Sequence, residues 1–127
     1  MQEKFLFEYA VIRVMPRVER EEFLNVGIIL YCAKPKFLKS IYKIDVNKLK
    51  MFSPEIDVEE IEENLKALER ISLAGNGSGT IGTYDMASRF RWLTATRSTV
   101  VQCSKVHPGF CIDAQETLTK LFEQLVL

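Results

Sequence analysis

Two charged segments carry the side chains that could do chemistry. The first, MPRVEREEFLNVGIIL at residues 15–30, lies between two apolar runs that are typical of neighbouring strands. A hairpin needs only two to five turn residues, so this connection carries more charge than a plain turn requires. Its charged residues are Arg17, Glu19, Arg20, Glu21 and Glu22.

The second segment, RFRWLTATRSTVVQ at residues 89–102, combines arginines with aromatic and hydroxyl side chains. If residues 85–93 are helical, Arg89 and Trp92 share a face away from the apolar stripe. Arg97, Ser98 and Thr99 then fall at the start of a strand. Guanidinium groups beside hydroxyls suit a carboxylate or phosphate oxygen, and interleaved aromatics suit stacking on a base. The alternative is that these arginines pair with acidic residues and that Trp92 belongs to the core.

Arg13 occupies an otherwise apolar strand face, where an unpaired guanidinium would be costly. We therefore expect a carboxylate partner for it, with Glu19, Glu21 and Glu22 as candidates. Asn25 and Gly27 indicate a bulge or a close backbone approach where the next strand begins. An exposed turn of mixed charge is the alternative for this connection.

His107 is the single histidine, and it lies in the spacing Cys103-x3-His107-x3-Cys111, with Cys32 a conceivable fourth ligand. Structural zinc sites usually contain two closely spaced cysteines, which this chain lacks, so we expect no metal and no cofactor. As a general base, His107 would need a nearby nucleophile, and Ser104 is the only one close in sequence. A role in a turn is the simpler expectation.

The composition indicates one globular domain over residues 1–127. Hydrophobic residues make up 47% of the chain and charged residues 27%, and 17 basic side chains balance 17 acidic ones. The charges are unevenly placed, since residues 86–112 hold four basic side chains and no carboxylate, whereas residues 55–69 hold seven acidic ones and one lysine. Three dispersed cysteines, and the lack of a signal or membrane-spanning run, favour a cytoplasmic protein.

The apolar pattern predicts an α+β fold with a small, mostly antiparallel sheet of about four strands packed with helices. We expect strands at 5–15, 26–33, 37–44 and 98–103, the first of them central because both of its faces are apolar. Helices are expected after the caps Asp45, Asp57 and Asp113, and over residues 85–95. The glycine-rich stretch 74–82 is predicted to be a loop that ends a helix at Gly75, and residues 105–110 (KVHPGF) are predicted to be a turn.

The strings YAVIRVMPRVEREEFLNVGIILYC and RFRWLTATRSTVVQCSKVHPGFC resemble the bacterial domain-of-unknown-function 3037 family. No activity is established for that family. The resemblance implies a partner or regulatory role, because members are often encoded beside a HipA-like kinase. It also singles out Pro16, Gly27, Arg91 and Gln102 beside the polar residues above.

We expect the two charged segments to converge at one end of the sheet in a shared Arg/Glu/Ser/Thr pocket. The predicted function is a non-enzymatic binding or regulatory module whose Arg-rich pocket receives an acidic group, with a HipA-like kinase as a candidate partner and no membrane association. The alternatives are a small enzyme acting on phosphoesters or nucleic acid, with Glu19, Glu22 or His107 as acid–base groups, and plain nucleic-acid binding. The candidate ligand-binding residues are Arg13, Arg17, Glu19, Arg20, Glu22, Asn25, Arg89, Arg91, Trp92, Arg97, Ser98, Thr99, Gln102 and His107.

Overall fold

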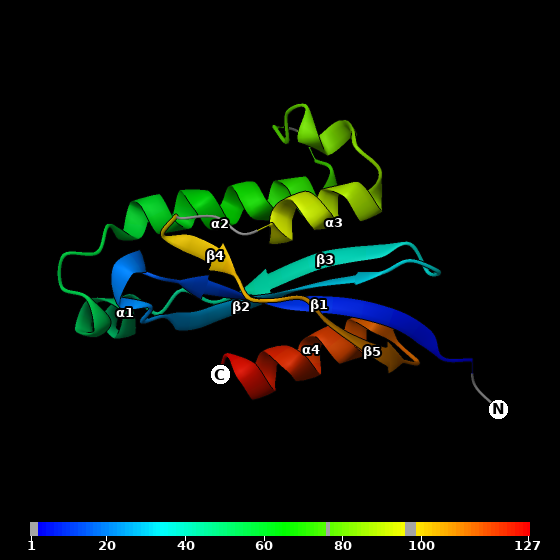
Figure 1. The fold of residues 1–127 in the computed structure, drawn as a ribbon, viewed down its shortest axis with the longest axis horizontal. Helices are drawn as coiled ribbons and strands as arrows, with labels where there is room; N and C mark the ends of the chain where they lie inside the picture. Colours follow the sequence, from blue (N-terminus) through cyan, green and yellow to red (C-terminus); the bar gives the residue numbers. More distant parts are fainter. Residues whose placement is uncertain (1–2, 76, 96–98) are drawn as a thin grey trace.

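A computed structural model describes residues 3–75, 77–95 and 99–127. Its five strands form one antiparallel sheet, in the order β3-β2-β1, with β4 and β5 one after the other along the far edge of β1 (Figure 1). The strands are β1 (Phe5–Val14), β2 (Leu24–Cys32), β3 (Phe37–Tyr42), β4 (Val101–Cys103) and β5 (His107–Cys111). The helices are α1 (Val46–Phe52), α2 (Val58–Leu73), α3 (Met86–Thr94) and α4 (Ala114–Leu125), with 3-10 turns η1 (Val18–Arg20) and η2 (Ile81–Thr83). The predicted α+β class is confirmed.

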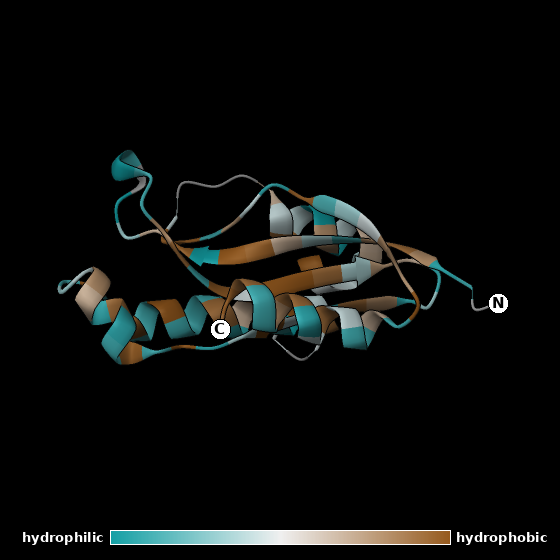
Figure 2. Ribbon diagram, turned by 90° about the horizontal axis from the view of Figure 1, so that it is seen from below, coloured by the Kyte–Doolittle hydropathy of each residue, from teal (hydrophilic) through white to brown (hydrophobic). Residues whose placement is uncertain are grey.

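The central position of β1 follows from its two apolar faces. Ala10, Ile12 and Val14 pack beneath α2 and α3, whereas Phe7 and Val11 pack against α4 on the opposite face. Viewed from the α4 side, the central strands are hydrophobic and the helices carry both hydrophobic and hydrophilic residues along their length, as amphipathic elements do (Figure 2). The prediction of a strand covered on both sides is confirmed.

Each of the four α-helices begins at an aspartate whose carboxylate accepts a backbone N–H three residues further on. The caps are Asp45, Asp57, Asp85 and Asp113. At Asp85 the N–H of Ser88 stabilises the charged carboxylate and lowers its pKa. The end of α2 differs from the prediction, because Ala74, and not Gly75, takes the left-handed conformation with φ of 55°.

Two irregularities shape the sheet around β1. The first is in β2. Ile12 of β1 lies opposite Gly27, but the next residue, Arg13, lies opposite Asn25, so Val26 is an extra residue in β2. A Cβ on Gly27 would lie 2.5 Å from the carbonyl oxygen of Ile41, so the expected bulge and close approach are both confirmed.

The second irregularity joins β4 to β5. The N–H of Ser104 donates to the carbonyl of Val11, and the Val11 N–H donates in return to the Ser104 hydroxyl, both at 2.8 Å. The hydroxyl therefore replaces a backbone carbonyl in the ladder. Ser104, the nearest nucleophile candidate to His107 in sequence, is buried and serves to connect strands.

The prediction of a turn over KVHPGF is wrong, since most of these residues form β5. Gly109 lies opposite Phe7 and allows its ring to cover the strand, because a Cβ at this position would come 2.6 Å from the ring. Pro108 is tolerated because β5 is an edge strand among the described residues. The tertiary pairing thus overrides the local turn signal.

Among the described residues, none of the helices has the length and apolar character needed to cross a membrane.

Candidate functional site

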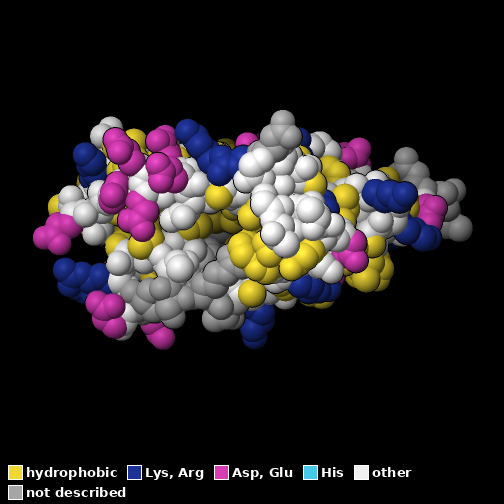
Figure 3. Space-filling view, turned by 90° about the horizontal axis from the view of Figure 1, so that it is seen from above, with side chains coloured by type: hydrophobic (Ala, Val, Ile, Leu, Met, Phe, Trp, Pro, Cys, Tyr) yellow, Lys and Arg dark blue, Asp and Glu magenta, His cyan; other side chains and the backbone are white. Residues whose placement is uncertain are grey.

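A groove of about 640 Å³ lies between α2, α3, β4 and the connection that follows β1. Figure 3 looks onto this face, where a hollow with hydrophobic side chains lies beside the acidic side chains of α2 (Figure 3). The described lining residues are Met15, Pro16, Glu19, Glu60, Asn64, Ala67, Leu68, Ile71, Trp92, Leu93, Ala95 and residues 99–103. The groove therefore brings together parts of both charged segments.

One wall is a face of α2. Glu60, Asn64, Ala67 and Ile71 recur at helical spacing, so they lie along one stripe of the helix beside the buried core residue Leu68. We did not identify this wall from the sequence as part of a site. The pattern was present, but it is the same amphipathic spacing that any core-facing helix shows.

The opposite wall is formed by α3 and β4. Trp92 is 38% exposed, so its indole is part of the surface of the groove. Two predicted ligand-binding residues form local hydrogen bonds, since the Thr99 hydroxyl donates to the Val101 carbonyl and the Gln102 amide donates to the Thr99 carbonyl, both at 2.7 Å. These contacts fix the backbone that enters β4.

The described lining of the groove carries acidic side chains, whereas the sequence led us to expect an Arg-rich pocket. Among the described lining residues, Glu19 and Glu60 are charged and no lysine or arginine is present. Arg97 and Ser98, which were central to the predicted anion pocket, lie outside the described residues. The described rim is thus acidic above an apolar floor.

Arg13 lies on the other face of the sheet. Its position on β1 is two residues from Val11, which packs against α4, and its guanidinium carbon lies 3.9 Å from the centroid of the Phe23 ring. None of the ion pairs found among the described residues involves Arg13, so the prediction of a carboxylate partner from Glu19, Glu21 or Glu22 is wrong. The guanidinium stacks on this ring instead, and its buried Nε has no hydrogen-bond partner among the described residues.

Asn25, opposite Arg13 in the sheet, faces the same side. Its side-chain amide donates to the carbonyl of Leu125 at the end of α4, at 3.1 Å. Arg13 and Asn25 therefore belong to the packing between the sheet and α4, and do not reach the groove beside α2.

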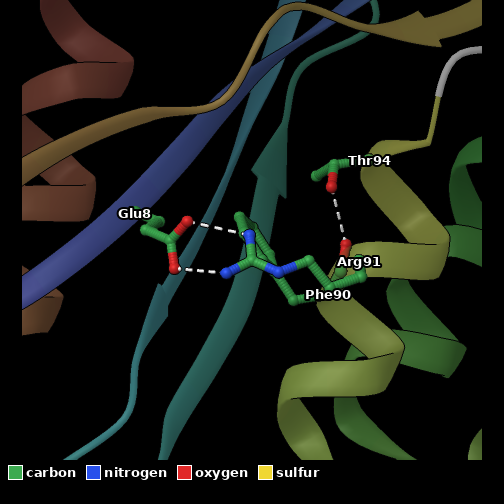
Figure 4. Close-up of polar contacts among 4 residues, drawn as sticks. All are labelled: Glu8, Phe90, Arg91 and Thr94. Atoms are coloured by element: carbon green, nitrogen blue, oxygen red, sulfur yellow. Dashed lines mark hydrogen bonds and ion pairs between the residues drawn. The ribbon is translucent and has the colours of Figure 1, made fainter.

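The two arginines of α3 have structural partners. Arg89 is only 8% exposed and donates to the Tyr84 carbonyl at 2.8 Å, so the predicted open face shared with Trp92 is wrong. Arg91 holds both carboxylate oxygens of Glu8 at 2.8 Å in a bidentate pair, which joins α3 to β1 (Figure 4). Hydrogen bonding to Glu8 raises the pKa of Arg91, so this guanidinium stays charged.

The remaining charges of the first segment stay at the surface. Arg20 pairs with Glu22 at 2.7 Å, and both side chains are more than half exposed. Together with Arg17 they line a smaller cavity of about 190 Å³ beside the end of α1. The alternative of an exposed mixed-charge turn describes this connection, and these charges do not fold back onto the sheet.

His107 lies in β5, opposite Tyr9, with the two ring centroids 5.4 Å apart. Cys103 packs with the core under α2 and α3, whereas Cys111 packs with the core over α4, so the two cysteines of the Cys103-x3-His107-x3-Cys111 spacing lie on opposite faces of the sheet. Burial, reinforced by the neighbouring Cys111 thiol, raises the pKa of Cys32 to about 11, which keeps that thiol protonated at neutral pH.

The comparison with protein families identifies the family of the chain. A family model described as a protein of unknown function (DUF3037) matches residues 9–126. The chain belongs to the DUF3037 family. No curated protein and no solved structure matches it significantly.

The residues that the DUF3037 resemblance singled out divide into separate groups. Pro16, Glu19, Trp92, Thr99 and Gln102 line the groove. The others that the structure describes lie at the sheet–α4 packing, in the Arg91–Glu8 pair, in the surface turn or along β5, except Arg89, which bonds to Tyr84, and Gly27, which lies at the bulge of β2. Glu19, Glu22 and His107, the acid–base candidates of the enzymatic alternative, fall into three different groups.

Proposed function

We propose that this DUF3037 chain is a non-enzymatic binding or regulatory module, and that the groove beside α2 receives a segment of a partner protein. The observation that carries the proposal is the composition of the groove: an apolar floor from α2, α3 and β4 under a rim with two carboxylates. Binding sites generally combine such apolar area with a few polar groups that fix orientation.

The charge of the rim indicates the character of the segment. Glu19 and Glu60 are exposed and reach the groove from different elements, so a lysine or arginine of the partner could meet either carboxylate while apolar residues cover the floor. An acidic ligand, the form expected from the sequence, would instead depend on Arg97.

The candidate partner is a HipA-like kinase, which the family resemblance implies. We would titrate the kinase into the chain by calorimetry and compare two charge reversals on α2. Glu60→Lys changes the rim, whereas Glu63→Lys makes the same change at an exposed position of the same helix that does not line the groove.

We expect Glu60→Lys to weaken binding about tenfold, equivalent to about 1.4 kcal/mol, and Glu63→Lys to bind within about twofold of the parent chain. Equal effects of the two reversals would show that only the general charge of α2 matters. Loss of binding in Arg97→Ala with retention in Glu60→Lys would instead favour the acidic ligand.

A further inference from the structure

The outer edge of β5 and the side chains beside it form an exposed surface. None of the residues of β5 is among the described lining residues of the groove. Phe110 is 71% exposed and Leu6, its cross-strand neighbour on β1, is 56% exposed. Ile112, one residue beyond β5, is also exposed. We propose that this surface, the β5 edge, pairs with the same edge of a second copy of the chain and makes one continuous sheet.

The backbone of β5 is oriented for such pairing. Met15 donates to Val100 and Ser104 donates to Val11, so the odd-numbered residues of β1 direct their backbone groups toward β4 and β5. Because this direction alternates along an antiparallel pair, His107, Gly109 and Cys111 bond to β1 and the residues between them face away. Pro108 and Phe110 therefore present their backbone groups to the outside.

A two-fold axis at Phe110 uses these backbone groups and requires no N–H from Pro108, which has none. The N–H and carbonyl of each Phe110 would bond to those of the other copy. In the same register, the Pro108 carbonyl would accept the N–H of Ile112 from the second copy, since the alternation continues to residue 112. In this register the Pro108 nitrogen faces the Ile112 carbonyl of the second copy, so the missing hydrogen removes one hydrogen bond at each end of the paired strands.

The side chains also suit a second copy. Leu6 and Phe110 are opposite each other in register and so share one face of the sheet, and the symmetric pairing places the two Phe110 rings side by side. Two nearby pairs of charges are satisfied within the chain, Lys34 with Glu3 and Arg91 with Glu8, whereas Lys4, beside Leu6 and Phe110, belongs to none of the ion pairs found among the described residues. Lys4 precedes β1, which lies one strand in from the β5 edge, so the two-fold pairing does not place its ammonium directly opposite that of the second copy.

The neighbouring helices leave room for the second copy. On one face α4 packs mainly under β2 and β3, and on the other α2 packs mainly over β3. In the described parts of the chain, neither helix has its main contacts with β5, so the second sheet can extend the first.

Sedimentation velocity over a series of concentrations tests the proposal. We expect the parent chain to show a reversible monomer–dimer equilibrium, and Phe110→Glu to weaken dimerisation at least about tenfold by placing two carboxylates at the axis. Met51→Glu is the matched control, because Met51 is also apolar and exposed, at 87%, but lies on α1. It should dimerise like the parent chain.

Hydrogen exchange of the Phe110 amide tests the register in the unmodified chain, so the result does not depend on how any variant folds. The exchange should slow as the concentration rises through the dimerisation range. A parent chain that stays monomeric to its solubility limit would overturn the proposal and would leave the edge to a strand from another protein. A dimer that persists in Phe110→Glu, or one in which Phe110 exchange is independent of concentration, would also overturn it.

Discussion

Substitution of Ser104 by alanine removes a hydrogen-bond acceptor that stands in for a backbone carbonyl. Ser104 is 5% exposed, and its hydroxyl accepts the N–H of Val11 at 2.8 Å and donates to the Lys105 carbonyl at 2.9 Å. In Ser104→Ala the buried Val11 N–H loses its partner. Leaving such a group unsatisfied costs roughly 1–3 kcal/mol of unfolding free energy. For a chain of 127 residues this lowers the melting temperature by roughly 4–11 °C.

The control is Ser40→Ala. Ser40 is also 5% exposed, but its hydroxyl meets only the Ser72 hydroxyl, at 3.4 Å, and Ser72 keeps a 2.7 Å bond to the Glu69 carbonyl. Removal of this hydroxyl leaves no backbone group without a hydrogen-bond partner, so we expect the unfolding free energy to fall by less than about 1 kcal/mol. Thermal and urea unfolding of both variants provide the comparison. If Ser104→Ala is no less stable than Ser40→Ala, the hydroxyl does not carry the strand junction and the reasoning is wrong.

Three further changes test other contacts. Gly109→Ala should lower the unfolding free energy by roughly 1–3 kcal/mol because its methyl group would meet the Phe7 ring, and urea unfolding of the double variant Gly109→Ala/Phe7→Leu should recover part of the loss. The pKa of Cys32 rises from 9.0 to about 11 on folding, so the unfolded state releases the thiol proton at lower pH than the folded state does. The contribution of this thiol to the unfolding free energy should be fully present below pH 9 and should fall as the pH approaches 11. In Cys32→Ala the urea midpoint should depend less steeply on pH over this range. Arg91→Gln should cost at most about 1 kcal/mol, because the guanidinium in the pair with Glu8 is more than half exposed, and the difference in melting temperature should shrink at high salt.

The predictable part of the fold depended on local patterns that no distant contact could reverse. The two apolar faces of β1 required cover on both sides, and Asp57 and Asp113 marked the starts of α2 and α4. The strand β5 was missed because Pro108 and Gly109 are turn formers by local preference. Their acceptance in a strand depends on the edge position and on the Phe7 ring, and neither is visible in the local sequence.

The site was predictable only in part, for a similar reason. The convergence of Glu19 with Trp92 and Thr99 agrees with the expected meeting of the two charged segments. The partners of individual arginines could not be read from the sequence, because Arg13 stacks on an aromatic ring and Arg89 donates to a turn carbonyl. Each partner is fixed by tertiary packing, where several carboxylates, rings and carbonyls compete for the same guanidinium.

Trp92 provides the most direct test of the proposed groove, since it is the only tryptophan of the chain and lines that groove. Labelling with 5-fluorotryptophan gives a single ¹⁹F resonance that the partner does not obscure. Titration with the HipA-like kinase should shift this resonance along the calorimetric binding curve in the parent chain and in Phe110→Glu, and only at higher kinase concentrations in Glu60→Lys. A resonance that stays in place while the kinase binds to saturation would contradict the assignment of the groove as the binding site.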